Sequence, residues 1–140
     1  MPEEKLNIPK DSNDKDIFDA SCLIVEDNII NQKIMGKFLT KLGIDPDIAN
    51  DGLEAVEAVK NKIYDIIFMD IQMPRMDGID ATKCILNDCN LENNPVIIAV
   101  TANSSELNKK KCFSCGMKDF ITKPISMKIM KKTLNQWLNK

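Results

Sequence analysis

The sequence predicts an α/β fold: a doubly wound, five-stranded parallel sheet with a helix after each strand, (βα)5. From residue 21 onward, short apolar runs alternate with segments of helical periodicity. Three of the runs are almost continuously apolar and rich in isoleucine and valine, which is typical of parallel strands covered on both faces. Each interval between runs is long enough for one crossover helix.

The strands are expected at the apolar runs. We place them at residues 22–25, 47–49, 63–69, 96–100 and 118–121, with the weakest signal at 47–49. Their carboxyl ends then fall near Asp27, Asn50, Asp70, Thr101 and Lys123.

The helices are predicted from apolar spacing and from capping residues. Apolar side chains recur every four residues before Gly43, at Ile30, Ile34, Phe38 and Leu42, which predicts a helix with a glycine at its C-terminal end. Capping residues mark the other helix starts: Asp51 with Glu54 three residues later, Asp77 before Gly78, Ser104 or Ser105, and Ser126. We expect these helices to contain Val56 and Val59, then Ile79 and Leu86, then a segment ending at Gly116, and finally Met127, Met130, Leu134, Trp137 and Leu138.

The chain divides into a short polar segment and one domain. Residues 1–18 are polar and mixed in charge, which predicts a flexible N-terminal segment or linker. Residues 19–140 form the folded domain, and a chain of 140 residues is of ordinary size for a single domain.

Composition also indicates a compartment. No apolar run approaches the ~18–20 residues that a membrane span needs, and the N-terminus lacks the apolar core of a signal peptide. The five cysteines are odd in number and show no disulfide framework, so we expect reduced thiols and a cytoplasmic location.

Charge and composition exclude several functions. The net charge of −2 and the pI of about 5.2 argue against nucleic acid as a partner, because that binding needs a basic face. The chain has no histidine, so it contains neither a histidine-based triad, nor an HExxH metal site, nor the autophosphorylating core of a histidine kinase.

Reactive side chains gather at the predicted carboxyl ends of the strands, where open α/β sheets bind ligands. Glu26 and Asp27 follow the first strand, Asp70 the third, Thr101 the fourth and Lys123 the fifth. Clustered carboxylates repel one another, and a hard divalent cation such as Mg²⁺ relieves that repulsion. A lysine and a hydroxyl suit phosphoryl oxygens, and a carboxylate can accept a phosphoryl group covalently. The set predicts Mg²⁺-dependent phosphorylation of an aspartate.

Asp70 is the best candidate for the acceptor. It follows the most buried-looking strand and precedes a loop, Ile71-Gln72-Met73-Pro74. Glu26 and Asp27 are expected to hold the metal together with Asp70 itself, and the backbone carbonyl of Gln72 could reach it.

These motifs resemble the receiver domain of two-component response regulators, and the resemblance covers residues 21–139. It is carried by Glu26-Asp27-Asn28, by the loop from Asp70 to Gly78, by Thr101-Ala102, by Phe120 and by Lys123-Pro124. Asn31-Gln32 and Gly116-Met117 look most like receivers of hybrid histidine kinases or phosphorelay proteins. The resemblance implies a flavodoxin-like, CheY-like sheet of strand order 2-1-3-4-5.

The resemblance also implies roles. Asp70 is the phosphorylated and catalytic residue with Lys123 and Thr101, while Thr101 and Phe120 form the output switch. The bond between Lys123 and Pro124 is implied to be cis, although sequence alone favours trans. Phe120 is equally well read as a core residue, and its phenyl ring lacks the hydroxyl of a tyrosine.

Further implications concern cofactor and partner. The cofactor is Mg²⁺, with Mn²⁺ able to substitute. The phosphoryl donor or acceptor is a histidine kinase or a histidine phosphotransfer protein, docking near Ile30, Ile34 and the loops around Asp70. We expect a monomer without membrane contact that catalyses only its own phosphorylation and dephosphorylation. It is a stand-alone receiver, a shuttle, or part of a hybrid kinase whose parent could be anchored in a membrane.

Two other functions fit parts of the pattern. A phosphatase of the haloacid dehalogenase type uses an aspartyl phosphate, but its acceptor lies on the first strand with a second aspartate two residues on, where this chain has Gln72. A flavodoxin-like cofactor protein needs a phosphate loop after the first strand, where this chain has Glu26 and Asp27. Two further motifs are interpreted as structural. Cys112 and Cys115 form a single CxxC without a second pair, and Lys109, Lys110 and Lys111 are interpreted as a solvated helix face.

Overall fold

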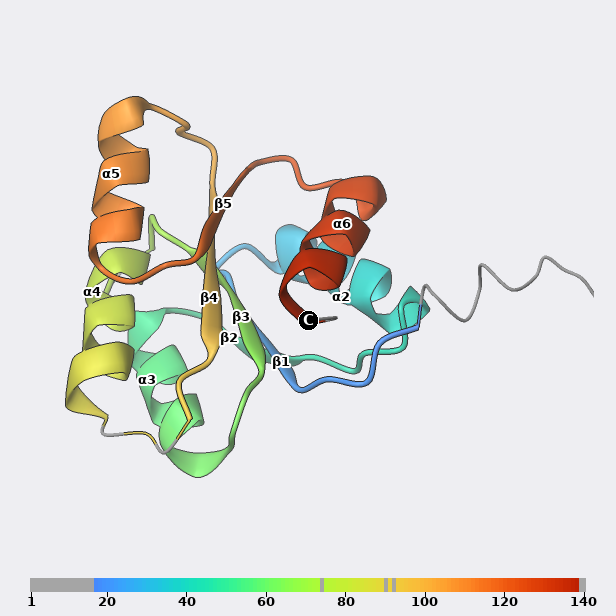
Figure 1. Ribbon diagram of the computed structural model, residues 1–140, viewed down its shortest axis with the longest axis horizontal. Coiled ribbons are helices and arrows are strands. Elements are labelled where there is room, and N and C mark those ends of the chain that lie inside the picture. The colour runs from blue at the N-terminus through green and yellow to red at the C-terminus, as the bar shows by residue number, and fades with distance from the viewer. Residues whose placement is uncertain (1–16, 74, 90, 92, 139–140) are drawn as a thin grey trace, which may run out of the picture.

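The computed structural model describes residues 17–73, 75–89, 91 and 93–138 as a doubly wound α/β fold (Figure 1). The parallel sheet has five strands in the order β2-β1-β3-β4-β5, so the expected topology is confirmed. The strands are β1 (Cys22–Val25), β2 (Asp47–Ala49), β3 (Ile66–Asp70), β4 (Val96–Thr101) and β5 (Asp119–Thr122). The helices are α2 (Ile29–Lys41), α3 (Gly52–Asn61), α4 (Gly78–Lys83), the π-helical turn η1 (Cys84–Asp88), α5 (Glu106–Ser114) and α6 (Met127–Leu138).

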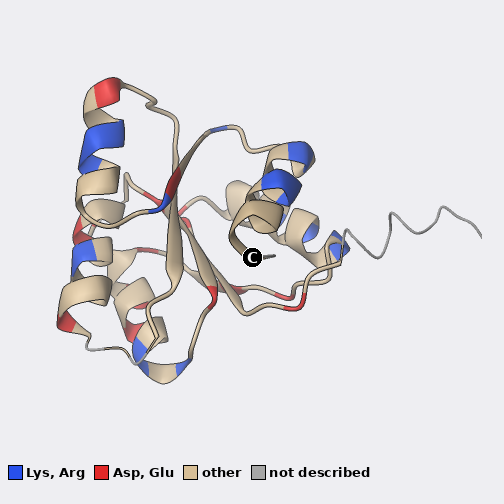
Figure 2. Ribbon diagram, viewed as in Figure 1, with Lys and Arg blue, Asp and Glu red and all other residues tan. Residues whose placement is uncertain are grey.

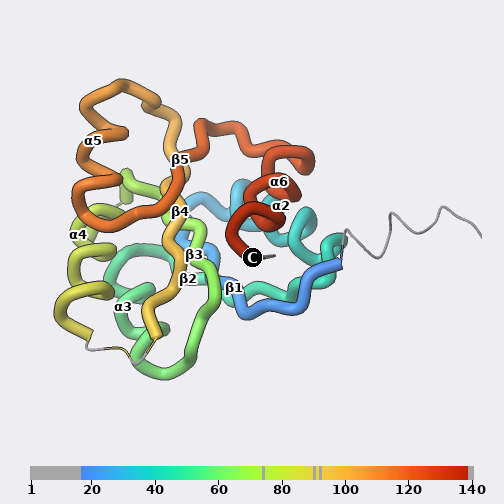
Figure 3. Tube along the Cα trace, in the orientation of Figure 1, coloured from blue at the N-terminus to red at the C-terminus, as the bar shows by residue number. Residues whose placement is uncertain are grey.

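Helices cover both faces of the sheet. α2 and α6 lie on one side, and α3, α4 and α5 lie on the other (Figures 1 and 3). Successive residues of β3 alternate between the two layers: Ile67 and Met69 pack with α3, α4 and α5, while Ile66 and Phe68 pack with α2 and α6. Burial on both faces explains why the strands read as continuous apolar runs.

The register of the sheet brings the strand ends together. Val25 pairs with Met69, Asp70 with Val100 and Thr101 with Thr122. The residue after Val25, which is Glu26, therefore lies level with Asp70 at the same edge of the sheet.

The predicted capping residues start their helices. Asp51, Asp77 and Ser105 accept hydrogen bonds from the backbone N–H groups of Glu54, Asp80 and Asn108, three residues on. Ser126 does the same for Ile129 at the start of α6. Gly43 and Gly116 have positive φ angles of 90° and 111°, which fits their predicted places after α2 and α5.

Some predicted bounds differ from the structure. The strand expected at 63–69 begins at Ile66, because Tyr64 turns its hydroxyl to Asp47 and Asp65 accepts the N–H of Ser21. The helix expected to run from Asp77 past Leu86 changes from α to π geometry at Cys84.

The apolar face predicted for α2 is confirmed only in its second half, where Leu42 is buried and Phe38 packs against the core. The helix exists, but it buries Gln32, Met35 and Leu39, while Ile30 and Ile34 are 68% and 41% exposed. A four-residue repeat drifts around a helix of 3.6 residues per turn, so its first members point away from the sheet.

One aromatic side chain of the predicted N-terminal segment lies in the core. Phe18, assigned from sequence to the flexible segment, is 4% exposed, packs in the core under α2 and donates its N–H to the carbonyl of Leu42. Ile17 of the same segment is exposed, and residues 1–16 lie outside the described residues. Within the described part of the chain, none of the helices combines the length and apolar character required to span a bilayer.

Two of the helical glycines, Gly78 and Gly36, are expected to respond oppositely to replacement by alanine. A Cβ at Gly78 would overlap the carbonyl oxygen of Asp70 and approach Cα of Ile71 to 2.8 Å, whereas a Cβ at Gly36 in α2 meets nothing within 4 Å. We expect Gly78→Ala to lower the free energy of unfolding by about 1–3 kcal/mol and Gly36→Ala to raise it by roughly 0.5–1 kcal/mol. Urea denaturation measures both, and equal effects would contradict the close contact at Asp70.

Candidate phosphoacceptor and metal site

Three carboxylates meet at the carboxyl edge of the sheet. Glu26, Asp27 and Asp70 each present an oxygen within 4.8 Å of the others. Glu26 and Asp70 are 2% and 4% exposed, whereas Asp27 faces solvent. The sequence-predicted acidic set is therefore one cluster, with two members shielded from water and one open to it.

Lys123 is the cation of this cluster. Its Nζ lies 2.9 Å from Glu26 Oε1 and 3.2 Å from Asp70 Oδ2. Burial alone would lower the pKa of this ammonium, but the carboxylates of Glu26 and Asp70 outweigh burial and raise the pKa above its ordinary value. Lys123 therefore carries its charge throughout the neutral range.

The formal charge of the cluster favours a divalent cation. Three carboxylates and one ammonium sum to −2 (−3 + 1). The donors are all hard oxygen atoms, which suit Mg²⁺, and the exposed Asp27 leaves the cluster open to an ion that keeps some of its waters. The described residues thus fit the metal predicted from the sequence.

Backbone N–H groups orient the two buried carboxylates. Asn28 donates to Glu26 Oε2 and Gln72 donates to Asp70 Oδ1, both at 3.1 Å. Gln72, predicted as a ligand through its carbonyl, is exposed and directly follows the Asp70–Ile71 step. Its role as a ligand stays a prediction.

Thr101 lies one residue beyond the β4 partner of Asp70. It is 1% exposed, its hydroxyl accepts the N–H of Asn103 at 3.1 Å, and its carbonyl accepts the N–H of Lys123 at 2.8 Å. The carbonyl contact places the end of β4 beside the residue that carries the ammonium. The Lys123–Pro124 peptide bond is cis, as the resemblance implied.

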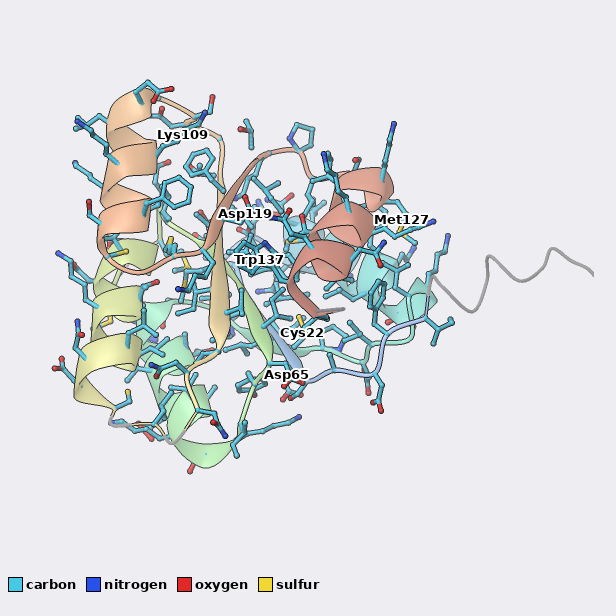
Figure 4. The ribbon with its side chains drawn as sticks, in the orientation of Figure 1. Cys22, Asp65, Lys109, Asp119, Met127 and Trp137 are labelled. Atoms are coloured by element: carbon cyan, nitrogen blue, oxygen red, sulfur yellow. The ribbon has the colours of Figure 1, made fainter. Side chains whose placement is uncertain are left out.

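Phe120 is half-buried on the edge strand β5. Its ring packs against the core on the α5 side, and Lys109 Nζ lies 5.8 Å from the ring centroid. The preceding residue, Asp119, accepts the indole N–H of Trp137 at 2.9 Å, which ties β5 to α6 (Figure 4). The position suits both interpretations of Phe120, as core and as switch.

A pocket of about 300 Å³ borders the cluster on its α2 side. It is lined by Glu26, Asn31, Ile34, Met35, Val100, Lys123, Pro124 and Ile125. The pocket joins the charged site to an apolar rim formed by α2 and the β5–α6 loop.

Hydrogen bonds through Gln32 link the cluster to the end of β2, a link that the sequence analysis did not predict. The Gln32 side-chain N–H₂ donates to the carbonyl of Glu26 at 2.6 Å and to Asn50 Oδ1 at 2.8 Å. Asn50 in turn donates to Glu54 Oε1 through its backbone and its side chain. Asn31-Gln32 stood out in the sequence only through the resemblance, and nothing in the spacing indicates that Gln32 meets Asn50.

The remaining singled-out residues lie away from the site. Burial raises the pKa of Cys112 to about 11, and the thiol of Cys115 contacts the Cys112 carbonyl, so the CxxC thiols stay protonated and packed. The lysines 109–111 form a band on α5 (Figure 2). Both observations agree with the structural interpretation of these residues.

Comparisons with known proteins agree with this geometry. The sequence model of the family described as response regulator receiver domain matches residues 22–135. Hybrid signal transduction histidine kinase B of Dictyostelium discoideum is 47% identical over 81% of this chain, which spans only 6% of that kinase.

Two solved structures are similar along nearly their whole length. The receiver domain of sensor histidine kinase PA1611 of Pseudomonas aeruginosa, solved with magnesium in its active-site cleft, has a TM-score of 0.79 and 33% identity, covering 88% of this chain and 100% of that one. The receiver of Saccharomyces cerevisiae Ssk1, solved with the phosphotransfer protein Ypd1, has a TM-score of 0.78 and 36% identity, covering 84% and 88%. The matches do not support the haloacid dehalogenase alternative.

Gln32 provides a stability test of the link behind the cluster. In Gln32→Leu the carbonyl of Glu26 loses its donor inside the protein, so we expect the free energy of unfolding to fall by about 1–3 kcal/mol. Gln136→Leu, the same change at an exposed position of α6, is the control and should stay near wild type. Urea denaturation compares the two, and an unaffected Gln32→Leu would argue against the observed hydrogen bonds.

Proposed function

The chain belongs to the response regulator receiver domain family, and we propose that it accepts a phosphoryl group on Asp70 from a phosphohistidine of a partner. The observation that carries this assignment is the buried Asp70 carboxylate, held 3.2 Å from the Lys123 ammonium within a cluster of three carboxylates. Asp70 ends a strand buried on both faces, and a loop rather than a helix follows it, so the carboxylate faces the open edge of the sheet.

The proposed reaction is the transfer of a phosphoryl group between two side chains. An oxygen of Asp70 forms a bond to phosphorus as the bond between phosphorus and the histidine nitrogen breaks, and the nitrogen retains the electron pair. The Lys123 ammonium lies where it can offset negative charge on a phosphoryl oxygen. Water later cleaves the acyl phosphate and regenerates the carboxylate.

Glu26, Asp27, Asp70 and the carbonyl of Gln72 are the proposed metal ligands. Mg²⁺, or Mn²⁺ in its place, would supply positive charge next to the phosphoryl oxygens. The −2 charge of the cluster and its oxygen donors support this assignment. A relative with magnesium in its active-site cleft supports it independently.

Thr101 and Phe120 are proposed to report the phosphorylation. The Thr101 hydroxyl accepts one backbone N–H and can turn its own proton to a phosphoryl oxygen on Asp70. Such a shift opens space next to β5, into which the half-buried ring of Phe120 can move.

The partner is proposed to be a histidine kinase or a histidine phosphotransfer protein that covers α2. Ile29, Ile30 and Ile34 are exposed on that helix, beside the pocket that opens at Glu26 and Lys123. The structure of a receiver solved with Ypd1 supports a partner of this kind. The chain spans between 4% and 27% of the length of the curated relatives that it matches. We therefore also propose that it is the receiver of a longer hybrid kinase. A monomer and a cytoplasmic location are also proposed; the five free cysteines support the second, because thiols stay reduced in that compartment.

Mass spectrometry tests the acceptor. Incubation with Mg²⁺ and acetyl phosphate should add one phosphoryl group to the wild-type protein, and none to Asp70→Asn or to wild type with the metal chelated. Thr122→Val, at the exposed end of β5, is a folded control that should gain the group. A label on Asp70→Asn, or none on wild type, would refute the assignment.

Substitutions on α2 test the docking face separately from the chemistry. Ile30→Asp should slow phosphoryl transfer from a histidine phosphotransfer protein about tenfold or more, because a charge enters the apolar contact. Its labelling by acetyl phosphate should stay at the wild-type rate. Ile63→Asp is the matched control, since Ile63 is 63% exposed, Ile30 is 68% exposed, and Ile63 precedes β3 at the opposite edge of the sheet. Equal transfer rates for both variants would remove α2 from the interface.

A further inference from the structure

The loop after Asp70 contains a residue in an unfavourable backbone conformation. Arg75 has φ of 64°, in the left-handed region that residues with a Cβ rarely adopt. Such a conformation persists only where surrounding contacts hold it. The Arg75 side chain is 57% exposed, so packing in the core does not stabilise this backbone conformation.

An ion pair between Arg75 and Asp51 stabilises the conformation instead. Arg75 Nε donates to Asp51 Oδ2 at 2.6 Å, and a terminal guanidinium nitrogen contacts the same oxygen. The other oxygen, Asp51 Oδ1, caps α3 through the N–H of Glu54. Burial would raise the pKa of Asp51, but the Glu54 N–H and the Arg75 guanidinium outweigh it and lower that pKa, so the carboxylate is ionised at neutral pH.

Two backbone hydrogen bonds depend on the same loop shape. Gly52 donates its N–H to the carbonyl of Met76, and Gly78 donates to the carbonyl of Ile71, both at 3.1 Å. The β2–α3 corner approaches the loop so closely that a Cβ on Gly52 would overlap the Met76 carbonyl. The loop is thus tied to the β2–α3 corner at Gly52, the residue that follows the capping aspartate Asp51.

The tied loop carries groups of the phosphoacceptor site. Gln72 lies in it, and its N–H holds Asp70 Oδ1 at 3.1 Å. Asp70 and Gly78 close the loop at its ends, with the Gly78 backbone against the Asp70 carbonyl. The shape of the loop therefore sets both the orientation of the acceptor carboxylate and the place of the Gln72 backbone.

We propose that Arg75 is a positioning residue: its ion pair with Asp51 holds the described residues of the loop, 71–73 and 75–77, in the arrangement that aims the Asp70 carboxylate for phosphorylation. Arg75 acts through the backbone of the loop, not by contact with the phosphoryl group. The inference rests on the proposed function, since it concerns the rate at which Asp70 is phosphorylated.

Three substitutions at two positions separate loop shape from charge. Arg75→Ala removes the ion pair and keeps a Cβ in the left-handed conformation, so we expect phosphorylation by acetyl phosphate at saturating Mg²⁺ to slow about tenfold. Arg75→Gly also removes the charge but adopts a positive φ freely, so the rate should return to within about threefold of wild type. Asp51→Asn keeps an oxygen for the helix cap and should slow the reaction as Arg75→Ala does.

The double variant and a distant ion pair complete the design. Asp51→Asn with Arg75→Ala should be no slower than the slower single variant, because both remove the Arg75–Asp51 ion pair. Arg75→Ala also removes a 3.9 Å contact between the guanidinium and Glu54 Oε2, so it is expected to be the slower of the two. Lys62→Ala removes a 2.8 Å ion pair with Asp47 at the other edge of the sheet and should keep the wild-type rate. Hydrogen exchange of the Gly52 and Gly78 amides should quicken about tenfold in Arg75→Ala while amides of β3 stay protected.

Several outcomes would overturn the proposal. These are a wild-type rate in Arg75→Ala, an equal loss in Arg75→Ala and Arg75→Gly, additive losses in the double variant, or loss of β3 protection along with the loop. If Asp51→Asn fails to fold, the alanine and glycine variants at Arg75 decide alone. If the wild-type protein accepts no phosphoryl group, the proposed function fails. Hydrogen exchange of the Gly52 and Gly78 amides then still tests whether the Arg75–Asp51 ion pair stabilises the loop.

Discussion

Electrostatic repulsion among three carboxylates is the constraint on which the site depends. Glu26, Asp27 and Asp70 share one edge of the sheet, and two of them are shielded from the water that would screen their charge. Lys123 balances part of that charge from the end of β5. A cluster left at −2 is a poor arrangement for stability alone and a good one for binding a divalent cation and a phosphoryl group. Repulsion at this edge lowers the stability of the folded state, and the apolar cores on both faces of the sheet offset that loss.

The sheet supplies the precision that the chemistry needs. In-register parallel pairing sets Glu26 level with Asp70 and Thr101 next to Lys123, so four separate segments meet without a long loop. Rigid strand ends hold side chains better than loops do. The one loop that enters the site, after Asp70, is tied to the β2–α3 corner by Arg75, Asp51 and Gly52. The side of the site proposed to receive a partner is instead bounded by the exposed isoleucines of α2.

Much of this arrangement was predictable from local signals. Strand positions followed from continuous apolar runs, because both faces of the sheet are covered, and helix starts followed from Asp51, Asp77, Ser105 and Ser126, because capping is a contact across three residues. The carboxylates, Thr101 and Lys123 could be grouped because parallel strands present their carboxyl ends on one edge. Bounds shifted where a tertiary contact intervened, as at Tyr64 and Asp65.

The sequence by itself determined the element order, the residue types at the strand ends and hence the class of chemistry, since these depend on periodicity and on neighbours a few residues apart. The tertiary structure alone decided which face of α2 is buried, that Phe18 joins the core, that Gln32 meets Asn50, and that Asp51 pairs with Arg75. Each of these contacts joins segments about 18 or more residues apart or depends on how a helix is rotated against the sheet. Such choices are made by packing of the whole chain, which no local pattern encodes.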